Sequence, residues 1–595
     1  MTSEGQRVRD LLAFLRDYRK ESILAPLLKL AESLMDLLVP LVVAAIINQG
    51  IAESDAGAIF RFFLLLIVLA ILGMAFSFSA QWMAAKASVG FSTKLRQALF
   101  DHIQSLSYRE LDTLGTDTLI TRMTSDINQI QNGLNLGLRL LLRSPFIVFG
   151  AMIMAFTIDV PSALIFAVAI PALSLVVFGI MLLSIPLFAK VQGALDRLLG
   201  MTRENLTGVR VIRAFCKEQQ EIEEFDRRND LLTSMNEHVG RLSALMNPAT
   251  YLIINVATIF LINQGALRVE LGALRQGDVV ALYNYMAQIV VELVKLASLI
   301  ITLNKSLACA RRVQEMLDVK PSMEYPTSLP AELPQTDEAV RFDHVTFSYA
   351  SSGDAVLSDI DFLAQKGQTV GIIGGTGSGK TSVVNLIPRF YDTTTGTVTV
   401  DGMDVRNYPA GELISRIGIV PQKAVLFEGS IRDNLRWGNE DASDDELWAA
   451  LETAQAAEVA RGKDGQLDAM IEQGGRNLSG GQRQRLTIAR ALVKRPEILI
   501  LDDSASALDF ATDLALRRAI ANLPGTMTVF IVSQRTSSVR EADQILVLDD
   551  GELAGIGTHD ELMEKCPVYQ EIYYSQFPDE RPSAARGHAG EEVAR

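Results

Sequence analysis

Cysteine is scarce in this 595-residue chain, which has three, Cys216, Cys309 and Cys566. So few cysteines exclude a small disulfide scaffold, and their spacing does not suggest a metal site. Charge is sparse as well, since 21% of the residues are charged and 49% are hydrophobic, which excludes a disordered chain. Single cores stop growing near roughly 250–300 residues, so we expect several domains.

Positive charge is deficient in the second half of the chain. Residues 321–595 contain 25 Lys and Arg against 42 Asp and Glu, a balance of −17. Residues 1–320 contain 30 and 28, a balance of +2, so the acidic surplus belongs to the C-terminal part. Domains that bind nucleic acid are normally basic, so we expect no nucleic-acid partner.

Long stretches of the N-terminal half contain no charged residue: 24 positions over 62–85, 30 over 160–189 and 26 over 242–267. A helix needs about 20 apolar residues to cross a bilayer. Together with three further apolar segments, they predict an all-α membrane domain over residues 21–320 in a lipid bilayer. Its six spans are expected at about 23–48, 60–85, 138–158, 160–188, 243–267 and 279–303.

Lys and Arg are absent from the two short connections but frequent in the two long ones. This bias places the long connections, both termini and all three cysteines in the cytoplasm of a multi-pass inner (plasma) membrane protein, with Arg268 and Arg275 as a mild exception. The long connections have helical periodicity, which predicts cytoplasmic helix extensions with short transverse helices near 108–116 and 210–218. Solvated charged helices are the alternative. Residues 1–20 suit an interfacial helix.

Six charged residues fall within or next to the predicted spans, where unpaired charge is costly. Lys29, Glu32 and Asp36 share one helix face, and Arg143, Glu292 and Lys295 lie on later spans. Ion pairing is the favoured role, with direct substrate contact by Glu292 as the alternative. Other polar residues suggest a cavity that is neither purely apolar nor strongly charged, or else helix packing: Tyr251, Asn255, Asn263, Tyr283, Asn284, Tyr285 and Gln288.

The pattern changes after a polar linker at 321–338, and residues 339–576 read as an α/β domain, followed by a tail at 577–595 that we expect to be disordered. Within the α/β domain, the segment "TVGIIGGTGSGKTSVVNLI" predicts a strand, a glycine-rich turn and a helix that bind phosphate through backbone N–H groups. Lys380 would reach the β- and γ-phosphates, and the Thr381 hydroxyl would hold Mg²⁺. The predicted nucleotide-binding residues of this phosphate loop are Gly374, Gly375, Thr376, Gly377, Ser378, Gly379, Lys380, Thr381 and Ser382.

Two further elements support nucleotide binding. A hydrophobic strand, "ILIL", ends at Asp502, whose carboxylate can hold Mg²⁺ through water. About 20 residues earlier, a segment that we call the signature precedes an amphipathic helix, whose N-terminus suits an anion. The signature residues are Leu478, Ser479, Gly480, Gly481 and Gln482.

With these motifs in this order, the chain resembles an ABC transporter half of the exporter type from about residue 6 to 576. The resemblance implies ATP and Mg²⁺ as cofactors, with Tyr349 stacking on adenine and Gln422 sensing Mg²⁺. It also implies that two ATPase domains pack head to tail, each ATP lying between one chain's phosphate loop and the other chain's signature. A second half-transporter is therefore required.

The sequence departs from the family pattern at two catalytic positions. Asp503 stands where the family has a glutamate general base, and Gln534 stands where it has a histidine that contacts the γ-phosphate. Asp is one methylene shorter, and Gln cannot carry a charge. These changes predict slow hydrolysis at the chain's own site, while the intact signature would serve a partner. The chain thus resembles the degenerate-site subunit of bacterial heterodimeric multidrug-type exporters, with a homodimer of two slow sites as the alternative.

The resemblance implies ATP-driven export of an amphipathic small molecule, whether drug-like, lipid or peptide. A lipid flippase, an ATP-gated regulator or an uptake system on the same fold are the alternatives. The six spans exclude a soluble ATPase.

Overall fold

The computed structural model describes residues 11–330, 334, 336–349, 353–523 and 525–581. The chain divides into two compact units, each described here by itself. The first consists of Met1–Gln104 and Asp117–Val319, and the second of Ser105–Thr116 and Lys320–Arg595.

The described residues of the first unit form helices and short connections and no strand. Within the described residues, six helical stretches of 40 to 53 residues are long and apolar enough to cross a membrane, and each contains one expected span. Where the membrane begins and ends along them stays a prediction. The helices are η1 (Leu12–Tyr18), α2 (Arg19–Ala45), η2 (Ile46–Ile51), α3 (Ala56–Ser105), α5 (Thr116–Thr121), η3 (Arg122–Asp126), α6 (Ile127–Leu140), α7 (Arg143–Ile158), α8 (Val160–Thr207), α9 (Val209–Ala214), α10 (Glu218–Ala244), α11 (Met246–Glu270) and α12 (Gln276–Leu317).

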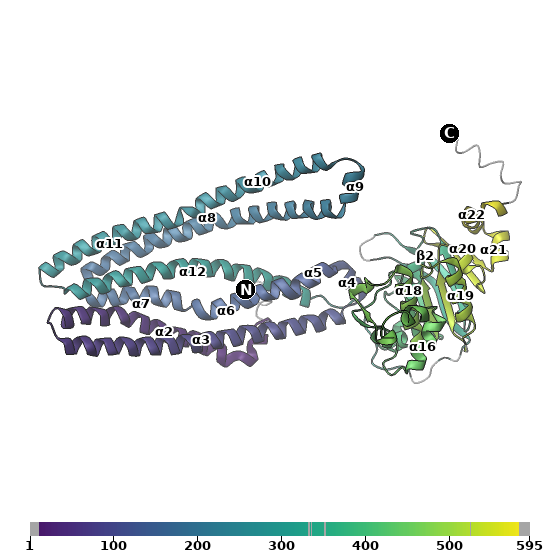
Figure 1. Cartoon of the computed structure of the whole chain (residues 1–595), viewed down its shortest axis with the longest axis horizontal. Helices are drawn as coiled ribbons and strands as arrows, with labels where there is room; N and C mark the ends of the chain where they lie inside the picture. The colour runs from purple at the N-terminus through teal and green to yellow at the C-terminus, as the bar shows by residue number, and fades with distance from the viewer. Residues whose placement is uncertain (1–10, 331–333, 335, 350–352, 524, 582–595) are drawn as a thin grey trace. The chain divides into compact units, whose positions relative to one another are not determined.

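The long connections are helical, as their periodicity predicts. In Figure 1, α8 and α10 run side by side and are joined at one end by the short helix α9. The other expected transverse helix is α4 (Tyr108–Leu114), which belongs to the second unit. Its capping box is closed by Ser107 and Glu110, which fixes its start.

One end of α8 shows how local chemistry and packing combine. Asp159 caps the helix by accepting hydrogen bonds from the Ser162 backbone N–H at 3.1 Å and its hydroxyl at 2.6 Å. The same carboxylate pairs with Arg268 of α11 at 2.5 Å. Arg268 is one of the two exceptions to the charge bias of the connections, and the structure gives it this ion pair.

Helix α12 is the central element of the first unit, packing against α2, α6, α7, α8 and α11. Its residues Tyr285 and Ile289 are fully buried, together with Phe166 of α8 and Leu261 of α11. The Tyr285 hydroxyl donates to the Leu37 carbonyl at 2.6 Å, which satisfies a polar group in an apolar core.

The second unit is built on two large sheets and has a small two-stranded one, β7-β8. A four-stranded antiparallel sheet has the order β2-β1-β4-β5, and a six-stranded sheet has the order β12-β11-β3-β10-β9-β6. The strands are β1 (Glu338–Phe347), β2 (Leu357–Gln365), β3 (Thr369–Gly374), β4 (Thr395–Val400), β5 (Met403–Asp404), β6 (Ile417–Val420), β7 (Gly429–Ser430), β8 (Met470–Ile471), β9 (Ile498–Asp502), β10 (Thr528–Val532), β11 (Gln544–Asp549) and β12 (Glu552–Gly557).

Helices complete this unit, and Figure 1 labels several of them. Besides α4 they are α13 (Lys380–Leu386), α14 (Glu412–Arg416), α15 (Ile431–Arg436), α16 (Asp444–Thr453), α17 (Ala457–Arg461), α18 (Gly480–Val493), α19 (Phe510–Ala521), α20 (Thr536–Val539), α21 (His559–Lys565) and α22 (Pro567–Gln576). Short 3₁₀ turns are η4 (Val405–Asn407), η5 (Gln466–Asp468), η6 (Gln473–Gly475) and η7 (Pro578–Glu580).

The six-stranded sheet is parallel except at β12, which pairs antiparallel with β11. All residues of β9 and β10 are buried, in keeping with their continuous apolar runs, because a parallel sheet is covered on both faces. Parallel pairing brings the carboxyl ends of β3, β10, β9 and β6 to one edge.

The two ends of the chain differ in detail from the expected elements. Residues 12–18 form a 3₁₀ helix that runs directly into α2, held to α3 by ion pairs Asp17–Lys94 and, at 2.7 Å, Glu21–Lys86. The beginning of the predicted interfacial helix lies outside the described residues. At the other end, η7 occupies the start of the predicted tail, and residues 582–595 lie outside the described part.

Candidate nucleotide site

Four neighbouring parallel strands of the second unit each end in a predicted site residue or loop. The phosphate loop follows β3, Asp502 ends β9, Gln534 follows β10 and Gln422 follows β6. Ligands of open α/β sheets bind at the carboxyl ends of such strands. Four segments spread over more than 150 residues therefore meet at one edge.

The phosphate loop has the strained backbone that its glycines permit. Gly379 caps α13 in the left-handed conformation, with φ +92°, and a Cβ there would lie 2.5 Å from the Leu357 side chain. The Lys380 Nζ donates to the carbonyls of Gly374, at 3.0 Å, and Gly375. Burial lowers the pKa of Lys380, and its ammonium lies within the loop that would cradle a phosphate.

A cavity of about 290 Å³ brings these segments together. It is lined by predicted residues of the phosphate loop, the acidic strand and both departing positions. The lining residues are Val356, Thr376, Gly377, Gly379, Lys380, Thr381, Ser382, Gln422, Asp502, Asp503, Val532, Ser533 and Gln534.

The oxygen atoms beside the phosphate loop suit a magnesium ion. The Thr381 hydroxyl donates to Asp502 Oδ1 at 3.1 Å, and the Gln422 amide lines the same cavity. Burial raises the pKa of Asp502, and a bound cation would favour its charged form. Mg²⁺ prefers one or two carboxylates together with substrate phosphates, so a hydroxyl, a carboxylate and an amide fit it.

Asp503 and Gln534 both line the cavity beside the phosphate loop, and their catalytic roles stay predictions. Asp503 has a left-handed backbone, φ +46°, and its N–H donates to the Val532 carbonyl at 3.0 Å. The Gln422 amide donates to Asp503 Oδ2 at 3.4 Å. The carboxylate is thus placed in the cavity by the sheet and contacted by the residue predicted to sense the metal.

Tyr349 lies next to the phosphate loop but is not a lining residue of the cavity. Its hydroxyl is 3.0 Å from the Ser382 hydroxyl, and its ring meets Phe347 and Tyr391 edge-on, with centroids 4.7 and 5.2 Å apart. This ring is near the site, and its stacking on adenine stays a prediction.

The signature is well formed but separate from this cavity. The Ser479 hydroxyl accepts from the Gln482 N–H at 3.3 Å, while the Gln482 side chain accepts from the Ser479 N–H at 2.9 Å, a closed capping box at the start of α18. Among the described residues that line the cavity, none belongs to 478–482. The chain's own phosphate loop and signature therefore do not form one site.

Gln576, at the end of α22, was not found from the sequence. Its Nε2 donates to the Gln534 carbonyl at 2.8 Å, and its Oε1 accepts from the Thr536 N–H and hydroxyl, both at 3.0 Å. It caps α20 from outside and fixes the loop that carries Gln534. No local pattern signals this role, because its partners lie 40 and 42 residues away.

Comparison with known proteins agrees with this geometry. Residues 22–293 match the ABC transporter transmembrane region, and residues 357–506 match the ABC transporter family. A protein of Mycobacterium tuberculosis described as an uncharacterized ABC transporter ATP-binding protein is 37% identical over 573 residues, 95% of this chain and 98% of that relative. One of the same description from Bacillus subtilis is 34% identical, also covering 95% and 98%.

Two further comparisons concern architecture. The fatty acid ABC transporter ATP-binding/permease protein of Mycobacterium bovis is 33% identical over 80% of this chain and 75% of its own length. The solved structure of a bacterial Atm1-family ABC exporter with ATP bound has a TM-score of 0.77 at 24% identity, covering 96% of this chain and 99% of that one.

The chain therefore belongs to the ABC transporters. It is a half-transporter with a membrane domain fused to an ATPase domain, and it has the Atm1-family exporter fold.

Asp502→Asn is expected to abolish the contribution of Mg²⁺ to ATP binding, because it removes the one carboxylate that contacts Thr381. The affinity of the purified chain for labelled ATP in Mg²⁺ should fall to the value measured in EDTA. Asp549→Asn is the matched control, an acid at the end of β11 that does not line the cavity. An Asp502→Asn chain that still gains affinity from Mg²⁺ contradicts the assignment.

Gln576→Ala is expected to loosen the loop of Gln534, because the first-turn N–H of α20 loses its cap. Hydrogen exchange should show protection of the Thr536 amide reduced by about fivefold, equivalent to the loss of about 1 kcal/mol. Gln570→Ala, on the same helix, removes a hydrogen bond to Met563 at 2.8 Å and should leave Thr536 unchanged. Equal effects of the two substitutions would show only a general loss of α22.

Proposed function

We propose that this chain is the degenerate-site subunit of a heterodimeric, ATP-driven exporter in the plasma membrane, with its termini and ATPase domain in the cytoplasm. The observation that carries the proposal is that Asp503 and Gln534 line the same cavity as Lys380, Thr381 and Asp502. The phosphate loop, Thr381 and Asp502 all remain, so the chain keeps the groups that bind ATP and Mg²⁺.

The two departures act on the attacking water rather than on nucleotide binding. The Asp503 carboxylate is drawn back by about an ångström relative to a glutamate, and a misplacement of that size costs about 10²-fold in rate. Gln534 can hydrogen-bond a phosphate oxygen but cannot carry the charge of an imidazolium. ATP is therefore held at this site and cleaved slowly.

The intact signature supports a partner of different sequence. Its N-terminal backbone N–H groups at α18 would meet the γ-phosphate of ATP held by the partner's phosphate loop. The partner is expected to have the glutamate and histidine that this chain lacks, together with an altered signature. The heterodimer would then contain one site that hydrolyses ATP fast and one that hydrolyses it slowly. A homodimer with two slow sites is the alternative.

Transport requires that closure of the ATPase domains reach the membrane helices. Within the second unit, α4 already contacts the ATPase surface: the Tyr391 hydroxyl donates to Asp112 Oδ2 at 2.6 Å, and the Tyr108 and Phe390 rings lie 4.5 Å apart. These contacts would transmit the motion through α4 so that the spans alternate between inward and outward opening.

The transported compound is proposed to be an amphipathic small molecule. The fatty acid transporter of Mycobacterium bovis favours a lipid as a second candidate, moved between leaflets by the same architecture. Retained ATP-dependent transport of a water-soluble dye in inverted vesicles would count against the flippase, and uphill accumulation there would exclude an ATP-gated regulator. Accumulation in right-side-out cells instead would indicate uptake.

The purified chain alone is expected to bind ATP with little turnover, because its own site lacks the glutamate and the histidine. Equilibrium binding of labelled ATP and steady-state phosphate release test this on the same sample. Lys380→Ala, which removes the phosphate-binding ammonium, is the control for nucleotide binding. Turnover at the ordinary rate of ABC exporters from the isolated chain would overturn the degenerate-site proposal.

The double substitution Asp503→Glu with Gln534→His is expected to raise hydrolysis at this chain's site by about 10²-fold, because it restores the reach and the charge. The gain should depend on the signature opposite, so it is measured with the partner carrying either its own or a restored signature. No gain with the restored signature would mean that these two residues do not limit hydrolysis.

A further inference from the structure

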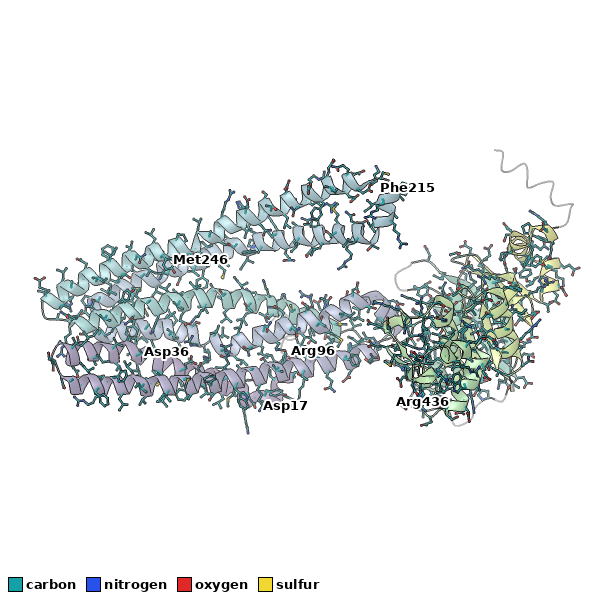
Figure 2. All side chains as sticks on the ribbon, in the orientation of Figure 1. Asp17, Asp36, Arg96, Phe215, Met246 and Arg436 are labelled. Atoms are coloured by element: carbon teal, nitrogen blue, oxygen red, sulfur yellow. The ribbon has the colours of Figure 1, made fainter. Side chains whose placement is uncertain are left out.

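The first unit contains a cavity of about 630 Å³ between α2, α7 and α12. Asp36, labelled in Figure 2 on α2, lies on its wall within the helical bundle. Each of the three helices contributes both charged and apolar residues to the lining. The lining residues are Asp36, Val39, Pro40, Val43, Arg143, Ile147, Asn284, Ala287, Gln288, Val291, Glu292 and Lys295.

Three carboxylates share one guanidinium in this wall. Arg143 contacts Asp36 at 3.0 Å, Glu292 at 3.1 Å and Glu32 at 3.9 Å. The predicted ion pairing of these residues is thus confirmed. Both Nη atoms of Arg143 contact carboxylates, its Nε is buried without a hydrogen-bond partner among the described residues, and its side chain is 14% exposed. This residue therefore offers little to an anionic ligand.

The two other acids are further neutralised, whereas Asp36 is not. Lys29 pairs with Glu32 at 2.5 Å, and Lys295 and Ser144 bind Glu292 at 2.9 and 2.8 Å. The side chains of Glu32 and Glu292 are 12% and 5% exposed, against 43% for Asp36. Asp36 is therefore the carboxylate with room for a second cation.

A buried acceptor in the same lining adds to the negative potential near Asp36. Gln288 Oε1, in the same lining, is buried and receives no hydrogen bond from the described residues. Asp36 also lines a second cavity, of about 700 Å³ between α2 and α3, together with Glu32, Met35, Phe78 and others. No Lys or Arg is among the described residues that line it.

Lys295 is the one exposed cation of the first cavity, at 45%, and it could attract an anion instead. Its ammonium is bound to Glu292, which lies one turn earlier on the same helix, and its long side chain can turn toward water. The short Asp36 side chain cannot leave the cavity in this way. The fixed charge presented to a ligand is therefore negative.

We propose that this cavity binds an amphipathic organic cation, with Asp36 selecting the positive charge and Val39, Val43 and Ile147 contacting the apolar body. This inference rests on the proposed export function, since it names the class of compound exported. A cation bound at Asp36 would form a second ion pair with this carboxylate, beside the one with Arg143. Ion pairs within the cavity are screened less than in water.

Two probes of equal shape and opposite charge test the proposal: tetraphenylphosphonium and tetraphenylborate. Their binding to the full chain in lipid nanodiscs is measured by equilibrium dialysis without nucleotide, after subtraction of empty nanodiscs. The wild type should bind the phosphonium at least about tenfold more tightly than the borate. Asp36→Asn should remove that preference, and Asp36→Glu should retain it. This pair of results would show that the preference requires the carboxylate and is not lost through misfolding.

Lys295→Gln, which removes a positive charge from the lining, should not weaken phosphonium binding. Glu53→Gln, which removes one negative charge from an exposed loop, is the control and should leave phosphonium affinity unchanged. Phosphonium binding that survives Asp36→Asn, borate binding that is tighter and depends on Lys295, or binding of neither probe overturns the proposal. Because the assay uses no ATP, these outcomes are independent of whether transport by the complete dimer succeeds or fails.

Discussion

The candidate nucleotide site depends on the parallel pairing of β3, β10, β9 and β6. These strands are apolar, and two of them are buried over every residue, so the sheet is held in place by helices on both faces. Polar residues become possible only where the strands end. The phosphate loop, the carboxylate proposed to bind the metal and both positions that depart from the family pattern therefore share one edge, and each could change without disturbing the core beneath it.

Both units keep a buried cation by surrounding it with several oxygens. Lys380 is held by carbonyls of its own loop, and Arg143 is held by carboxylates of α2 and α12. The consequences differ, because Lys380 can exchange its carbonyls for phosphate oxygens, while Arg143 is fixed from several helices at once. The contacts of Lys380 suit a site whose ligand binds and dissociates. The contacts of Arg143 suit a rigid cavity wall, with the ligand binding at another residue of that wall.

The place of the candidate nucleotide site could be predicted, because Gly374 to Thr381 and Asp502 lie in contiguous motifs that are each typical of one local structure. The long apolar helices could be predicted from stretches without charged residues, and their extensions from the helical spacing of apolar residues. The shared contacts of Arg143 were not, because sequence placed Lys29, Glu32 and Asp36 on one face but could not show which later helix would meet it. Gln576 carries no local signal at all, since its role exists only when α22 folds back onto α20.

The shared arginine also bears on how the chain enters the membrane. Asp36 arrives with the first span, whereas Arg143 follows 107 residues later and Glu292 another 149 after that. Glu32 has Lys29 one turn away, so that pair can insert as a neutral unit. If the first span lies where the sequence predicts it, Asp36 enters the bilayer or the insertion machinery unpaired and stays so until α7 follows. Stable insertion of the first span therefore depends on synthesis of the third. A chain truncated before α7 would lack Arg143, the cation that pairs with Asp36.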